Sequence, residues 1–235
     1  MTAAAQRRAV RSSVAARSRA GSAHLRLTTL VLDLGGVVVP TLFEARCGPG
    51  LPSGPFGSPA HDRAWADVEA GRTQERDYWA ALALSRPDLD LAACVTRGLG
   101  VRPELRAMLA GLGGRLRLAG LTNDMAHWFG PDWPQRFPEL LGFDALLEAA
   151  GSGSLKPDPG VFRWALGQLG TPAARCLFVD DLPANLRGAA AVGMATEHFD
   201  VTDPLASFHR VLARVGLAPK SPGPKVFRLP ATRYR

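Results

Sequence analysis

Three short runs of apolar residues stand out along this chain, and each of them ends on polar residues. The runs cover residues 27–33, 116–122 and 175–181. Short apolar runs bounded by turn residues are typical of buried strands. Apolar residues at helical spacing predict three helices, over 103–111, 159–169 and 184–192. The first precedes the second run, the next lies between the second and third runs, and the last follows the third run. Strands that alternate with helices predict an α/β fold with a parallel sheet.

The stretch between the first and second predicted strands, residues 39–115, is too long for one crossover helix. Its part from 47 to 59 is rich in Gly and Pro and predicts an irregular loop. Residues 62–84 carry aromatic and aliphatic side chains at near-helical spacing, interrupted at Gly71, which predicts two short helices. We therefore expect a small helical cap beside the strand ends, with its aromatic side chains forming the core of the cap.

The formal net charge of +7 belongs to the two ends of the chain. Residues 1–32 hold six arginines and no acid, and residues 204–235 hold seven basic residues and no acid. The middle, residues 33–203, therefore holds 15 basic and 21 acidic residues, a net charge of −6. Nucleic-acid binding needs a basic surface, so it is not expected of the folded part and is left to the basic tails.

The composition also indicates the cellular compartment of the protein. No apolar stretch reaches the length of a membrane span or forms a secretory signal, and Cys47, Cys94 and Cys176 lie too far apart to predict a disulfide framework. We expect a cytoplasmic protein without a membrane span. The Arg-rich N-terminal segment keeps organellar targeting open as an alternative.

Polar residues at the ends of the three predicted strands are candidates for a site. Asp33, Thr122, Asp180 and Asp181 would meet at one edge of a parallel sheet, where such sheets bind ligands. Two carboxylates 4 Å apart repel by about 4 kcal/mol at an effective dielectric constant near 20. A divalent cation would remove that repulsion, and an all-oxygen ligand set suits Mg²⁺. By itself, Asp33 before two glycines could equally cap a turn.

Lys156 is the only lysine between residues 33 and 203. It lies in a proline-containing turn that leads into the predicted helix at 159. We expect this turn to hold the ammonium group beside the acids, while a surface loop lysine is the alternative.

Four motifs in this order resemble those of the haloacid dehalogenase (HAD) superfamily, over residues 29 to about 205. They are DLGGV at 33–37, LTN at 121–123, KPDP at 156–159 and VDDLPAN at 179–185. The resemblance implies a Rossmann-like three-layer core with a parallel sheet and a small α-helical cap inserted after strand one. The expected organisation is a disordered basic tail at 1–27, a core at 28–40 and 101–208, a helical cap at 41–100, and a basic Pro-containing tail at 217–235.

The resemblance also implies the roles of the catalytic residues. Asp33 would be the nucleophile that accepts a phosphoryl group as an aspartyl-phosphate. Thr122 and Asn123 would bind the phosphoryl oxygens, and Lys156 would bind and stabilise their charge. The implied activity is Mg²⁺-dependent hydrolysis of a small phosphorylated metabolite.

The metal site implied by the resemblance combines side-chain and backbone oxygens. Asp33, the carbonyl of Gly35, Asp180 and Asp181 would hold Mg²⁺, and Asn185 would support the loop. The dehalogenases of the superfamily work without metal and lack the paired acids, so Asp180 and Asp181 favour phosphoester chemistry over a metal-independent dehalogenase.

One position departs from the superfamily. Its phosphatases usually carry a second Asp, the general acid, two residues after the nucleophile, where this chain has Gly35. A missing general acid costs about 10²–10⁴ in rate, so we expect a preference for low-pKa leaving groups and an accumulating phosphoenzyme. Glu44, Asp124 and His127 lie near the motifs, but each is expected to be a solvated loop residue. Gly35 also keeps open a catalytically degenerate binding or regulatory protein.

Overall fold

The computed structural model describes residues 26–45, 51–57 and 62–217. Within them, five parallel strands form one sheet in the order β3-β2-β1-β4-β5. The strands are β1 Thr29–Leu32, β2 Arg117–Thr122, β3 Ala145–Glu148, β4 Cys176–Asp180 and β5 Ala195–His198. The three predicted strands are thus the three central ones, β2, β1 and β4.

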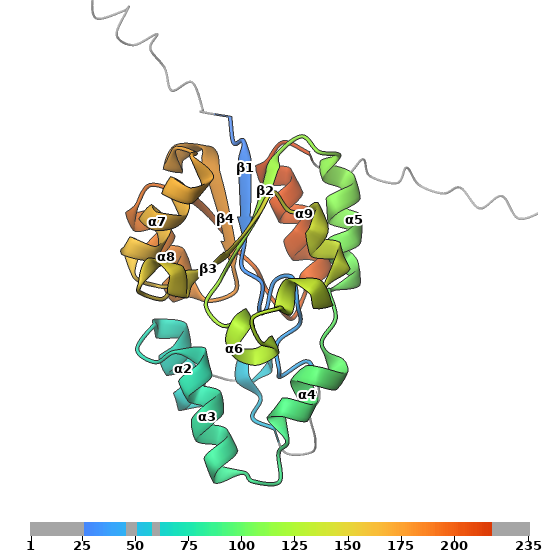
Figure 1. Ribbon diagram of the computed structural model, residues 1–235, viewed down its shortest axis with the longest axis vertical. Coiled ribbons are helices and arrows are strands. Elements are labelled where there is room, and N and C mark those ends of the chain that lie inside the picture. The colour runs from blue at the N-terminus through green and yellow to red at the C-terminus, as the bar shows by residue number, and fades with distance from the viewer. Residues whose placement is uncertain (1–25, 46–50, 58–61, 218–235) are drawn as a thin grey trace, which may run out of the picture.

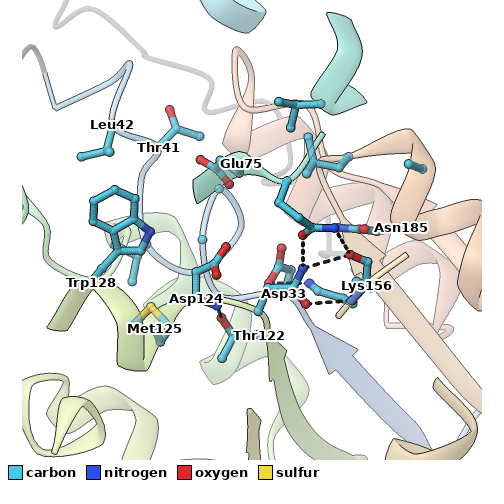
Figure 2. A pocket seen from close by; sticks show the side chains of 18 of the residues that line it. Asp33, Thr41, Leu42, Glu75, Thr122, Asp124, Met125, Trp128, Lys156 and Asn185 are labelled. Atoms are coloured by element: carbon cyan, nitrogen blue, oxygen red, sulfur yellow. Dashed lines mark hydrogen bonds and ion pairs between the residues drawn. The ribbon is translucent and has the colours of Figure 1, made fainter. Parts of the chain in front are cut away.

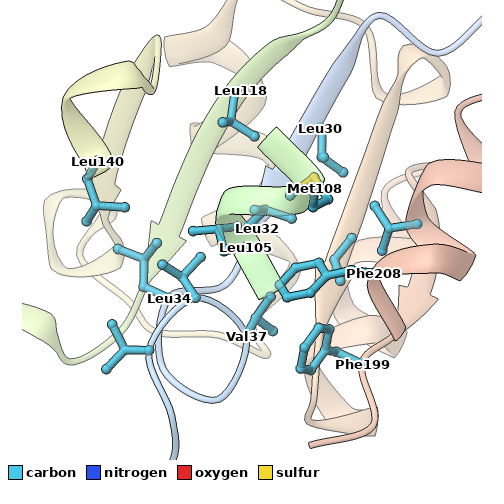
Figure 3. Close-up of a cluster of buried hydrophobic side chains, with 14 of the residues drawn as sticks. Leu30, Leu32, Leu34, Val37, Leu105, Met108, Leu118, Leu140, Phe199 and Phe208 are labelled. Atoms are coloured by element: carbon cyan, nitrogen blue, oxygen red, sulfur yellow. The ribbon is translucent and has the colours of Figure 1, made fainter. Parts of the chain in front are cut away.

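The central strands are apolar because both faces of the sheet are covered. Every residue of β1 is buried, and Leu30 lies beside Leu118 of β2 and Leu177 of β4. Successive side chains of a strand point to opposite faces. Leu30 therefore joins one hydrophobic core, shown in Figure 3, while Val31 joins the core on the other face.

Helices cover both faces of the sheet (Figure 1). The helices α5 Pro103–Leu112 and α9 Pro204–Arg214 pack on one face, and α7 Pro159–Leu169 and α8 Pro183–Ala191 pack on the other. These layers confirm the predicted Rossmann-like α/β fold with a parallel sheet, and the three helices predicted around the central strands are present.

The edge strands β3 and β5 were not predicted from the sequence. All four residues of β3 are only partly buried, as are the first three of β5, whose His198 is exposed. Such strands carry mixed side chains and need no continuous apolar run, so the pattern that marks central strands is missing from them.

Helices also occupy the segment between β1 and α5. The inserted helices are α2 Arg63–Ala70, α3 Glu75–Ser85 and α4 Leu91–Gly98. The first two match the predicted pair, and α4 was not predicted. α2 begins where Asp62 Oδ1 accepts a hydrogen bond from Trp65 N at 2.9 Å, and it ends at Gly71, whose φ is 77°.

Aromatic side chains form the core of the inserted helices, as expected. Phe43, Trp65, Tyr78 and Trp79 contact one another through ring centroids 4.6–6.0 Å apart. This cluster lies apart from the two cores of the sheet and is completed by aliphatic residues of α4. In Figure 1 the inserted helices lie beyond one end of the sheet.

The remaining elements connect these layers. They are α6 Met125–Phe129 and short 3₁₀ helices at Gly54–Phe56, Trp133–Arg136, Pro138–Gly142, Ala149–Ser152 and Ala173–Arg175. No helix in the described part of the chain has both the length and the apolar character needed to cross a membrane.

Two expectations concern residues at the limits of this description. The disordered tails expected at 1–27 and 217–235 lie almost entirely outside the described residues, as do residues 47–50 and 58–59 of the irregular loop expected at 47–59. The expectation that the cysteines form no disulfide is wrong for Cys94, which is disulfide-bonded, while Cys176 is free and buried.

Candidate functional site

The carboxyl ends of the central strands bring the expected site residues together (Figure 2). Asp33 follows β1, Thr122 ends β2 and Asp180 ends β4, and all three are buried. Lys156 bridges the two acids, with its Nζ 2.8 Å from Asp33 Oδ1 and 2.9 Å from Asp180 Oδ2. Its side chain is only 1% exposed, which excludes the alternative of a surface lysine.

The turn that carries Lys156 is fixed by Asn123. The backbone N of Lys156 donates to Asn123 Oδ1 at 2.9 Å, and Asn123 Nδ2 donates to the Lys156 carbonyl at 3.0 Å. Gln74, just before α3, donates to the same carbonyl and accepts from Asn123 Nδ2. The inserted helices therefore contact the Lys156 turn directly.

Asp180 is held on both oxygens. Asn185 Nδ2 lies 3.0 Å from each of them, and Leu182 N donates to Oδ1 at 2.8 Å. With Lys156 on Oδ2, the carboxylate has a fixed orientation. Asn185, in the first turn of α8, therefore contacts the Asp180 carboxylate directly.

Asp33, Asp180 and Asp181 form a cluster whose oxygens lie within 4.8 Å of one another. Burial raises the pKa of both Asp33 and Asp181, and the neighbouring acids raise them further. Burial by itself would lower the pKa of Lys156, but Asp180 and Asp33 raise it above its usual value, so this cation stays charged. Three carboxylates against one ammonium leave a surplus of negative charge, as a cation site requires.

A backbone loop after Asp33 makes room for this cluster. Gly36 has a φ of 76°, and a Cβ atom there would overlap the Asp181 carboxylate. Arg102, which was not singled out from the sequence, holds this loop by donating from Nη2 to the Gly36 carbonyl at 2.8 Å.

A cavity opens above the cluster and contains about 800 Å³ of space, including open solvent at its mouth. Asp33, Thr122 and Lys156 lie at its polar end, and Gly35 also lines it. Most of the remaining wall is apolar and comes from the inserted helices, from α6 and from the loops after β1 and β4. These apolar residues are Val39, Pro40, Leu42, Val68, Val95, Leu99, Met125, Trp128, Phe129 and Leu182.

The three candidates for a replacement general acid differ in their surroundings. Glu44 is not the solvated residue expected, because it forms a buried ion pair with Arg102. Asp124 lines the cavity and is also largely buried, with Arg76 Nη2 2.7 Å from its Oδ1. His127 is exposed, as expected, but it lies in α6 and not in a loop.

Glu75 is an acid of the cavity that sequence reasoning missed. It is the first residue of α3, and Figure 2 shows its side chain reaching into the cavity from the inserted helices. Trp79 Nε1, one turn later, donates to Glu75 Oε1 at 3.0 Å. Burial raises the pKa of Glu75 to about 7. The sequence contained one signal for this residue. Glu75 stands four positions before Trp79 in a predicted cap helix, a spacing that lets the indole N–H reach the carboxyl group.

The chain is similar in sequence to several known proteins. Residues 27–193 match the family model of haloacid dehalogenase-like hydrolases. A sesquiterpene phosphatase of Aspergillus oryzae is 31% identical over 170 residues, which span 68% of this chain and 84% of that protein. Flavin mononucleotide hydrolase 1 of Arabidopsis thaliana, named as a chloroplast protein, is 26% identical over 188 residues, 77% of this chain and 72% of the relative.

Among solved structures, an L-2-haloacid dehalogenase superposes with a TM-score of 0.53 at 20% identity, over 74% of this chain and 86% of the dehalogenase. This likeness concerns the fold. The family match covers most of the chain and includes the strand-end residues Asp33, Thr122 and Asp180, so the assignment rests on more than the fold. The chain belongs to the haloacid dehalogenase-like hydrolase family.

Proposed function

We propose that this protein is a phosphomonoesterase that hydrolyses a small phosphorylated metabolite through an aspartyl-phosphate on Asp33. The observation that carries the proposal is the buried Lys156, held between Asp33 and Asp180 at the polar end of the cavity. A fixed cation beside a carboxylate nucleophile can stabilise the charge of a transferring phosphoryl group. The names of the two relatives, a phosphatase and a flavin mononucleotide hydrolase, support the same chemistry.

Asp33 has one oxygen suited to attack. Its Oδ1 is engaged by Lys156 and by the backbone N of Leu34 at 2.7 Å, so we assign the attack on phosphorus to Oδ2. Thr122, the last residue of β2, and Asn123 line the same end of the cavity, where the Thr122 hydroxyl and the Asn123 backbone N would bind phosphoryl oxygens. Lys156 would hold both the nucleophile and a phosphoryl oxygen during transfer.

The acids fit a magnesium ion. Asp33, Asp181 and the Gly35 carbonyl would bind it, and Asp180, whose two oxygens are already engaged, would act by positioning Lys156 or through a water. The room that Gly36 leaves for the Asp181 carboxylate supports this donor set. Bound there, Mg²⁺ would neutralise and orient the phosphoryl group.

The apolar wall of the cavity supports a substrate whose organic part is apolar. Trp128 and Phe129 of α6 and Val95 and Leu99 belong to one apolar cluster, and all four line the same cavity as the phosphoryl-binding residues. Apolar contact would stabilise a bound alkyl chain by about 0.8 kcal/mol per buried methylene. A sesquiterpene phosphate, the substrate type in the name of one relative, belongs to this chemical class.

The test is steady-state hydrolysis of p-nitrophenyl phosphate with Mg²⁺ and with EDTA. We expect metal-dependent turnover in the wild type, and loss of turnover in Asp33→Asn. Asp77→Asn is the matched control, because it changes an exposed acid of α3 and should retain the activity. A folded wild type without turnover and without a phosphoenzyme would contradict the proposal and favour a binding protein.

A further inference from the structure

Position 35 leaves a gap in the catalytic machinery. Gly35 offers no side chain, and a Cβ atom built there meets nothing within 4 Å, so the space beside the phosphoryl-binding end is open. A leaving alkoxide needs a proton donor near this end of the cavity. Among the residues that the structure describes, the acids that line the cavity apart from Asp33 are Asp124 and Glu75.

Asp124 and Glu75 are held in different ways. Burial raises the pKa of Asp124 above its ordinary value, but the carboxylate is paired with the Arg76 guanidinium at 2.7 Å, which lowers that pKa and occupies Oδ1. Glu75 accepts a hydrogen bond from the Trp79 indole, and no ion pair to it forms within the described part of the chain. Its carboxyl group projects from the first turn of α3 into the cavity (Figure 2).

We propose that Glu75 is the general acid and base of this enzyme, an inference that rests on the proposed phosphomonoesterase function. As Asp33 Oδ2 bonds to phosphorus and the bond from phosphorus to the leaving oxygen breaks, the Glu75 carboxyl gives its proton to that oxygen and releases an alcohol. The Glu75 carboxylate then takes a proton from water as the water oxygen attacks phosphorus. The Asp33–phosphorus bond breaks, which releases inorganic phosphate and restores both residues.

The surroundings of Glu75 suit this double role. Burial raises its pKa to about 7, the Trp79 hydrogen bond lowers it, and Asp124 and Asp180 raise it. A carboxyl group that is about half protonated at neutral pH can both give and take a proton. The other charged groups around this part of the cavity are Asp33, Arg76, Lys156 and Asp181.

The test compares two leaving groups in wild type and Glu75→Gln, in the presence of Mg²⁺. The variant should lose about 10²–10⁴-fold in kcat/KM for hexyl phosphate, whose alkoxide needs a proton. Its kcat/KM for p-nitrophenyl phosphate should stay within about tenfold, because nitrophenolate leaves without protonation. Without the base for the second step, p-nitrophenyl phosphate should give a burst of one nitrophenol per enzyme and a lower kcat.

The pH profile supplies an independent readout. Glu75 must be protonated to act as the acid, so wild-type kcat/KM for hexyl phosphate should fall as the pH rises through about 7. This basic limb should be absent from Glu75→Gln with the same substrate. The open space at Gly35 permits a rescue, since Gly35→Asp in the Glu75→Gln background should restore hydrolysis of hexyl phosphate.

Asp77→Asn removes an exposed acid from the same turn of α3 and should retain both activities. Equal losses on both substrates in Glu75→Gln would overturn the inference, and so would a selective loss on hexyl phosphate in Asp124→Asn instead. A wild type inactive on both substrates would instead refute the proposed function. Glutamine can still accept the indole hydrogen bond; if the variant nevertheless unfolds, Glu75→Asp should show the same selective loss, and an equal loss would again overturn the inference.

Discussion

Replacing Lys156 by methionine tests the charge balance of the site. The change removes two buried ion pairs, at 2.8 Å to Asp33 and 2.9 Å to Asp180, while an apolar chain of similar length fills the space. At an effective dielectric constant of 20, each pair has a Coulomb energy of about 6 kcal/mol. Much of this is offset by the cost of burying the charges, so we expect the free energy of unfolding to fall by about 3–5 kcal/mol.

Urea denaturation in EDTA, followed by circular dichroism, measures this loss. Arg163→Met is the matched control, because it removes one positive charge from an exposed position of α7 and should change stability by less than about 0.5 kcal/mol. Lys156→Met should also lose hydrolysis of p-nitrophenyl phosphate. A variant as stable as the wild type would refute the reasoning, since it would mean that the two carboxylates do not depend on Lys156.

Four further results are expected. Glu44→Gln, which leaves the buried Arg102 without its anion, should lower the free energy of unfolding by about 3 kcal/mol in a urea titration. Mg²⁺ at about 100 times its Kd should stabilise the wild type by about 2.7 kcal/mol in the same titration, and Asp181→Asn should need far more Mg²⁺. Trp79→Phe removes a hydrogen bond that lowers the pKa of Glu75, so the basic limb of the hexyl phosphate profile should move to higher pH. Lengthening the alkyl chain of the substrate should raise kcat/KM about fourfold per methylene until the cavity is filled, and a flat series would contradict the apolar subsite.

The central strands and the residues at their ends could be predicted from the sequence. A strand buried on both faces must be apolar along its length, which makes β1, β2 and β4 visible as continuous runs. The chain must then leave the sheet at the same edge, so Asp33, Thr122 and Asp180 could be placed together. Lys156 was found because it is the only lysine in the acidic middle of the chain.

Other features depend on contacts between distant segments. The edge strands β3 and β5 have no continuous apolar pattern, and they exist because the neighbouring strands offer free hydrogen-bonding edges. Glu44 belongs to a loop, where a carboxylate is normally solvated, and only the fold brings Arg102 against it from 58 positions further along the chain.

Glu75 is a residue of the site whose local structure could be predicted from the sequence but whose place in the cavity could not. Its sequence context predicts no more than an acid in the first turn of a helix, where such residues are common because they face the positive end of the helix dipole. Its place in the cavity depends on how the inserted helices pack against the strand ends, through Gln74 and the Lys156 turn. Local sequence determined the central strands, the motifs that follow them and the charged residues at their ends, because each of these features depends on neighbouring residues. Tertiary packing alone decided that the Glu75 carboxyl group lines the same cavity as Gly35, because the two residues lie 40 positions apart in the chain.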